Sequence, residues 1–153
     1  MANLTYRAAK PDDASVCIEI RGMTRENAFS QEELHALGVT TESWSMGIKD
    51  GSCPGFVACD DGRIVGYCFG DRDTGEIVVL ALLPSYEGRG IGKTLLAKMV
   101  KQLKNQGFQR LFLACSSDPD VRSYSFYRHL GWSPTGEKDD SGDEILEIKL
   151  NHN

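Results

Sequence analysis

A continuous apolar segment near the middle of the chain runs from Ile77 to Leu83 and meets Pro84. A glycine-rich stretch follows, Glu87-Gly88-Arg89-Gly90-Ile91-Gly92-Lys93-Thr94, and then apolar residues recur at helical spacing. Glycines at alternate positions allow a tight turn with exposed N–H groups, and the start of a helix adds further N–H groups and a positive dipole end. The sequence therefore predicts a buried strand that leads into an anion-binding turn, where an anionic cofactor would sit.

Two well-known phosphate-binding motifs do not fit this stretch. A Walker A loop requires glycine five residues before the glycine of Gly92-Lys93-Thr94, but Glu87 stands there. A dinucleotide-binding fingerprint that begins at Gly88 would end on a glycine where the chain has Lys93. From these residues alone, an ordinary glycine-rich turn between a strand and a helix stays open as the alternative.

A second informative segment lies downstream, from Asp120 to Trp132. It contains Phe126-Tyr127 in a helical pattern and closes on Gly131-Trp132. Together with the strand and the glycine-rich loop before it, this segment resembles the GNAT superfamily of acyl-CoA-dependent N-acyltransferases, over residues 76–132. The resemblance implies acetyl-CoA as co-substrate, and transfer of its acetyl group to a primary amine by direct attack in a ternary complex.

The length and composition of the chain agree with one domain over residues 1–153. A net charge of −5 without any basic run argues against nucleic-acid binding. Five scattered cysteines without a Cys-x-x-Cys pair indicate reduced thiols, and hence a cytoplasmic location. We expect no signal peptide and no membrane partner, because no apolar stretch approaches the roughly 20 residues that span a bilayer.

The predicted elements follow one α/β (α+β) order. Strands are expected at Leu4–Arg7, Gly55–Cys59, Ile64–Gly70, Glu76–Leu83, Leu111–Ala114, Trp132–Thr135 and Glu144–Leu150. Helices are expected to begin at Pro11, after Thr40 or Thr41, after the glycine-rich loop, and at Pro119 with Asp118 as N-cap. This order predicts a mixed, mostly antiparallel central sheet of six to seven strands flanked by helices. In the GNAT resemblance, two central strands splay apart to admit pantetheine.

The resemblance also assigns three catalytic residues. Glu76 takes the place of a glutamate that acts as a base through ordered water, and partial burial would raise its pKa for this role. The N–H of Leu82, two residues before the proline, would bind pantetheine and polarise the acetyl carbonyl. Tyr127 would return a proton to the leaving thiolate, because a phenol with a pKa of about 10 is close to a thiol with a pKa of about 8.5.

Each catalytic assignment has a structural alternative. Glu76 also fits a solvated residue at the start of a strand, and the Leu82 side chain fits ordinary core. Tyr127 also fits a core anchor on a helix. Tyr124, three residues earlier on nearly the same helical face, is then the alternative acid.

The cofactor-binding residues implied by the resemblance gather in the glycine-rich loop, whose N–H groups would face the pyrophosphate. Glu87 replaces the glutamine or arginine usual in the family, and we expect its side chain to turn outward. Asp120 replaces an asparagine that contacts pantetheine, and it could accept a hydrogen bond from a pantetheine N–H. The full set is Leu82, Leu83, Glu87, Gly88, Arg89, Gly90, Ile91, Gly92, Lys93, Thr94, Asp120 and Tyr127.

Several other residues carry no strong signal. The histidines are too dispersed for a metal site, so no metal is expected: His35, His129 and His152. Cys115 fits a small buried residue as well as it fits a nucleophile. Trp44 and Phe29 could line an acceptor pocket or anchor a lid.

One rival function remains: a catalytically silent acyl-CoA-binding or regulatory module of the same fold. The presence of both Glu76 and Tyr127 favours the enzyme. The expected acceptor is a small-molecule or peptide amine selected by the segment Thr24–Lys49, and a homodimer is left open. The resemblance does not choose between an acetyl group and a longer acyl group.

Overall fold

The structure is a computed structural model that describes residues 3–23, 31–36, 38–140 and 142–150. Its strands form two antiparallel sheets, with orders β1-β2-β3-β4 and β5-β7-β6. The strands are β1 (Leu4–Ala8), β2 (Gly55–Asp60), β3 (Arg63–Gly70), β4 (Ile77–Leu82), β5 (Arg110–Cys115), β6 (Ser133–Lys138) and β7 (Glu144–Lys149). The predicted α/β fold is confirmed, and the seven strands within the described ranges match the expected number.

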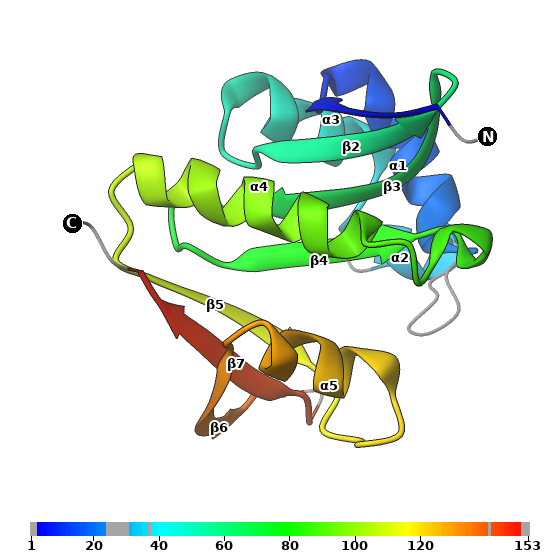
Figure 1. The fold of residues 1–153 in the computed structure, drawn as a ribbon. Helices are drawn as coiled ribbons and strands as arrows, with labels where there is room; N and C mark the ends of the chain where they lie inside the picture. Colours follow the sequence, from blue (N-terminus) through cyan, green and yellow to red (C-terminus); the bar gives the residue numbers. More distant parts are fainter. Residues whose placement is uncertain (1–2, 24–30, 37, 141, 151–153) are drawn as a thin grey trace.

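Helices cover both faces of the first sheet (Figure 1). On one face lie α1 (Ala14–Arg21), which follows a 3₁₀ turn at Pro11–Asp13, and α3 (Thr41–Asp50). On the other face lies α4 (Ile91–Asn105), while α5 (Arg122–His129) packs beside the second sheet. A short helix, α2 (Gln31–Ala36), precedes α3 along the chain.

Local sequence signals explain several of these elements. The turn between β2 and β3 holds Asp61 and Gly62 at φ 55° and 84°, which is the geometry that an Asp-Gly hairpin favours. Helix α3 begins after Thr40, whose hydroxyl accepts a hydrogen bond from the Ser43 N–H at 3.0 Å. Apolar residues of α4 at helical spacing are buried against the first sheet: Ile91, Leu95, Leu96, Met99 and Leu103.

The start of α5 differs from the expectation. We predicted a helix from Pro119 with Asp118 as N-cap, but α5 begins at Arg122 after Val121. The carboxylate of Asp118 instead accepts a hydrogen bond from the Asp120 N–H at 2.9 Å, which closes a local turn. An aspartate side chain can stabilise such a turn as well as a helix start, and here the turn is formed.

The two sheets meet at one end of β4 and β5 and then diverge (Figure 1). A parallel bridge pairs Glu76 with Phe112, and the Phe112 N–H donates to the Gly75 carbonyl at 3.2 Å. Beyond this junction β4 pairs with β3, whereas β5 pairs with β7. The splay between β4 and β5 leaves the facing edges of both strands open to a ligand.

In the part of the chain that the structure describes, no helix is both long and apolar enough to cross a membrane.

Candidate functional site

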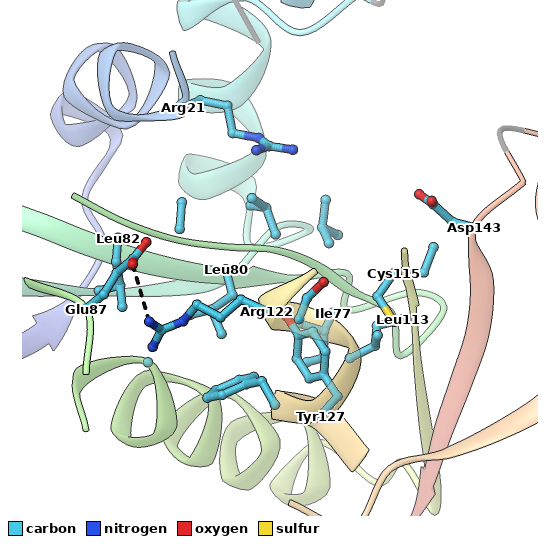
Figure 2. A pocket seen from close by; sticks show the side chains of 17 residues that line it. Arg21, Ile77, Leu80, Leu82, Glu87, Leu113, Cys115, Arg122, Tyr127 and Asp143 are labelled. Atoms are coloured by element: carbon cyan, nitrogen blue, oxygen red, sulfur yellow. Dashed lines mark hydrogen bonds and ion pairs between the residues drawn. The ribbon is translucent and has the colours of Figure 1, made fainter. Parts of the chain in front are cut away.

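A cavity of about 380 Å³ lies where β4 and β5 diverge (Figure 2). One wall is the whole of β4, and the opposite wall is Leu113–Cys115 of β5. Other elements contribute Arg21, Glu87, Gly92, Arg122, Ser123, Phe126, Tyr127 and Asp143. The cavity therefore collects side chains from both sheets and from three helices.

The main chain of β4 presents polar groups to this cavity. The Leu83 N–H donates to the Val65 carbonyl of β3 at 2.9 Å, so it points away from the cavity. Because successive N–H groups of a strand point in opposite directions, the Leu82 N–H is directed toward the open edge of β4. This donor is where the resemblance requires one, and it can polarise a carbonyl oxygen placed in the cavity.

The glycine-rich loop lies between Glu87 and Gly92, both of which line the cavity. Gly88 and Gly90 have φ of 76° and 80°, and a Cβ atom at either position would meet no described atom within 4 Å. Gly90 is also the N-cap of α4, so the first N–H groups of that helix open into this space. With exposed Arg89 in the loop and exposed Lys93 in the first turn of α4, this turn fits an anionic group.

The side chain of Glu87 does not turn outward, so that prediction is wrong. Its carboxylate pairs with Arg122, the first residue of α5, at 3.3 Å. The Glu87 side chain is 14% exposed and lines the cavity, as Figure 2 shows. The cation that attracts Glu87 comes from a distant segment, which the local reasoning about the loop did not consider.

Tyr127 lies in the cavity wall, and only 9% of the residue is exposed. Its ring meets those of Phe126 and Trp132 edge-on, with centroids 5.1 Å and 6.2 Å apart. Burial raises the pKa of Tyr127, so the phenol keeps its proton across the ordinary pH range. A buried, protonated phenol beside an open strand edge can donate a proton to a leaving group.

Tyr124, the alternative acid, is not among the residues that line the cavity. The Arg128 guanidinium lies 3.6 Å from its ring centroid and is held there by Glu144 at 2.6 Å. The structure therefore brings Tyr127, and not Tyr124, into the site.

Ser123 is a cavity residue that the sequence reasoning missed. Its Oγ is buried and makes no hydrogen bond to any part of the chain that the structure describes. A buried hydroxyl without a partner is unfavourable, so its position in a cavity fits a polar group of a ligand such as an amide. The available signal was its spacing, four residues before Tyr127 on the same helical face.

Two carboxylates could act as the base, Glu76 and Asp143, and they occupy different places. Glu76 stands at the junction of the sheets, half-buried and next to the cavity residue Ile77, but outside the lining itself. Burial raises the pKa of Glu76, and Asp71 and Asp139 raise it further. Asp143, which precedes β7, does line the cavity, and burial beside Asp139 raises the pKa of its carboxyl. Nothing in its charged turn singled it out from the sequence.

The remaining predicted residues lie outside the cavity lining. Asp120 is exposed, and its N–H serves the local turn described above. Ile91 is buried core, and the Thr94 hydroxyl donates back to the Gly90 carbonyl at 3.0 Å. Leu83 is partly buried between the two sides of the first sheet.

Other sequence candidates prove structural or fall outside the described residues. Cys115 lines the cavity, but burial raises the pKa of its thiol, which disfavours a nucleophilic thiolate. Trp44 packs edge-on against Tyr67 and Phe69 in the core, at 5.5 Å and 5.2 Å, and Phe29 lies outside the described residues. Over the described ranges, no group of three or more His, Cys, Asp or Glu side chains could hold a metal ion.

Sequence comparison matches residues 17–132 to the profile of the acetyltransferase (GNAT) family. Mycothiol acetyltransferase from Saccharomonospora viridis is 25% identical over 142 residues, covering 84% of this chain and 44% of that protein. The ribosomal protein bS18-alanine N-acetyltransferase of Haemophilus influenzae is 33% identical over 76 residues, covering 48% of this chain and 51% of that protein. The chain thus spans about half the length of these curated relatives.

Solved structures share the fold. PaiA N-acetyltransferase from Thermoplasma acidophilum, in complex with coenzyme A, superposes with a TM-score of 0.79 at 24% identity, covering 97% of this chain and 99% of that chain. The ribosomal-protein-S18-alanine N-acetyltransferase from Escherichia coli superposes with a TM-score of 0.72 at 14% identity, covering 98% and 96%. At such identities the likeness concerns the fold alone.

Proposed function

Because the chain belongs to the acetyltransferase (GNAT) family, we propose that it transfers an acetyl group from acetyl-CoA to a primary amine. The observation that carries this proposal is the cavity between β4 and β5, which joins an anion-binding turn, an open strand edge and a buried phenol. The reaction is direct attack of the amine on the thioester carbonyl in a ternary complex. No covalent acyl-enzyme is required, in agreement with the raised pKa of the Cys115 thiol.

Acetyl-CoA supplies an activated acetyl group, and the residues of the cavity fit it. The N–H groups of Gly88–Lys93 face the pyrophosphate, with support from the positive N-terminal end of α4. The buried Ser123 hydroxyl meets a polar group of the pantetheine arm, and this contact replaces the one we expected from exposed Asp120. The coenzyme A bound in the Thermoplasma acidophilum protein of the same fold supports acetyl-CoA as the co-substrate.

The Leu82 N–H stabilises the negative charge that develops on the carbonyl oxygen during attack. Tyr127 then donates its proton to the thiolate as the carbon–sulfur bond breaks. The phenol is protonated in the resting enzyme and so carries a proton for this step, although its raised pKa also makes it a weaker acid than a solvated tyrosine.

The amine must lose a proton before or during attack, since its ordinary pKa is about 10.4. We assign this role to Glu76 acting through water, because its raised pKa makes it a better base than a solvated carboxylate. Asp143 is the competing base, because it lines the cavity directly and its pKa is also raised.

The proposal is tested by continuous thiol release from acetyl-CoA in the presence of a library of primary amines. An acetyltransferase releases thiol steadily with at least one amine, and the acetylated amine appears in equal amount by mass spectrometry. Binding of acetyl-CoA by calorimetry, without thiol release for any amine, would instead identify a silent acyl-CoA-binding module.

A further inference from the structure

Arg21 is a cavity residue to which the proposed reaction gives no role. It is the last residue of α1, it is half-buried, and it lines the cavity. Figure 2 shows its side chain reaching from α1 toward the space above β4. An arginine stays protonated at all ordinary pH values, so this wall carries a permanent positive charge.

The position of Arg21 separates it from the expected phosphate site. Ile20, the residue before it, packs in the core on the α1 and α3 face of the first sheet. The glycine-rich loop leads into α4, whose residues pack on the opposite face. Arg21 therefore approaches the cavity from the side away from the pyrophosphate, where the second substrate must enter to reach the same carbonyl.

A guanidinium in this place recognises an acid group. Its planar fork of five N–H donors matches a carboxylate, and it can keep a contact with the protein while it binds a ligand. Arg21 also interacts with another part of the protein, and it can keep that contact. Among the described titratable groups near it are Tyr67 and Tyr127, which stay neutral at neutral pH because burial raises both pKa values. Asp143 lines the same cavity and carries the opposite charge.

We propose that Arg21 determines acceptor specificity by binding a carboxylate of the amine substrate, so that the preferred acceptors are amino acids or peptides with a nearby free acid group. The inference rests on the proposed acetyl transfer. Arg21 holds the carboxylate, and the negative charge of Asp143 favours the ammonium end of the same molecule. The cavity thus suits a zwitterion better than a simple amine or a polyamine.

The experiment compares matched acceptors. Thiol release is measured with α-, β- and γ-amino acids, with the amide of each, and with the amine that lacks the acid group. Each series is run with the unaltered protein and with Arg21→Gln, Arg21→Lys and Arg21→Glu. The control is Arg63→Gln, which removes the same charge from the exposed start of β3, outside the cavity.

For the unaltered protein, an amino acid should have a lower KM than its amide. Arg21→Gln should raise KM for the acid about 10- to 100-fold, the range for a lost hydrogen bond to a charged group, and leave the amide unchanged. Arg21→Lys should restore part of the loss, and Arg21→Glu should prefer amides or diamines. Arg63→Gln should change neither KM, and acetyl-CoA affinity by calorimetry should be equal in all variants.

Two outcomes would overturn the inference alone. One is equal turnover of acids and amides by the unaltered protein. The other is a fall in kcat, equal for acids and amides, in Arg21→Gln, which would place Arg21 at the reacting carbonyl or at Tyr127. A folded protein that binds acetyl-CoA but acetylates no member of any series overturns the proposed function and this inference together.

Discussion

In the first sheet, β3 is buried at every position after Arg63, whereas in the second sheet β6 is exposed at every position except Thr135. Two ion pairs support the second sheet and its helix, Arg110–Glu147 and Arg128–Glu144. The first sheet combines apolar contacts with α1, α3 and α4 with one ion pair at its edge strand, Arg7–Asp13. The cavity lies between these two regions. The first sheet supplies the main-chain wall formed by β4, and the second region supplies the side chains of Ser123, Tyr127 and Asp143.

The largest effect is expected at the anion-binding turn of the first region. Gly90→Val should abolish measurable acetyl-CoA binding, because a side chain would fill the space left for the pyrophosphate and would resist a φ of 80°. Calorimetry measures the binding, and circular dichroism checks the fold. Gly136→Val is the matched control, because Gly136 also has a positive φ, 90°, and open space around it. Unchanged affinity in a folded Gly90→Val protein would remove the basis of the cofactor assignment.

The second region is tested by Tyr127→Phe, which keeps the ring contacts with Phe126 and Trp132. Loss of the acid should lower kcat by roughly 10²- to 10⁴-fold and leave acetyl-CoA affinity nearly unchanged. The control is Tyr124→Phe, because Tyr124 lies outside the cavity lining. If Tyr127→Phe keeps most of its turnover, Tyr127 is a packing residue.

The junction between the regions is tested by comparing Glu76→Gln with Asp143→Asn. A raised pKa means that the basic form appears only as pH rises through it, so kcat/KM should rise with pH in the unaltered protein. Loss of the base should lower kcat/KM roughly 10²-fold for an acceptor of high pKa, and less for one of low pKa. The variant that loses this pH dependence identifies the base, and a small, equal loss for both acceptors would argue against that residue.

Thermal stability is a control for the Glu76→Gln variant. Burial raises the pKa of Glu76 above its unfolded value, so the ionised carboxyl costs the folded state stability at pH values above that pKa. Glu76→Gln should therefore keep or slightly raise the Tm at neutral pH. A lower Tm would mean that lost activity reflects unfolding and that the carboxylate makes a stabilising contact.

The smallest effect is expected for the ion pair that spans the two regions. Glu87→Gln removes a negative charge beside the expected pyrophosphate, so acetyl-CoA affinity should rise by a few-fold at low salt, and the gain should shrink as added salt screens it. The partly exposed pair with Arg122 contributes little to stability, so Tm should change little. The control is Glu137→Gln on exposed β6. A weaker affinity would show that Glu87 mainly positions Arg122 for the ligand.

Features encoded by neighbouring residues were predicted well from the sequence. The start of α3 after Thr40 and the strand, loop and helix from β4 to α4 depend on short-range signals. The local turn at Asp118 shows the limit, because the same residue can cap a helix or close a turn.

Features that depend on distant segments were not predicted. The contact of Glu87 with Arg122 joins residues 35 positions apart, and it reverses the direction expected for the Glu87 side chain. Arg21, Ser123 and Asp143 reach the cavity only because α1, α5 and the start of β7 converge on it. Their residue types are common at solvated positions, so the folded arrangement is what distinguishes them.

The bridge between Glu76 and Phe112 also has a geometric consequence for the cavity. The bridge joins β4 and β5 at one end. A small change in the angle between these strands therefore moves their far ends more than the residues beside the bridge. Gly75 lies next to Glu76 at this bridge and has a φ of 81°. A Cβ atom at this position would lie 2.9 Å from the Phe108 ring. A side chain at Gly75 would therefore press on Phe108 beside this junction, and a resulting change in the angle between β4 and β5 would alter the cavity from outside its lining.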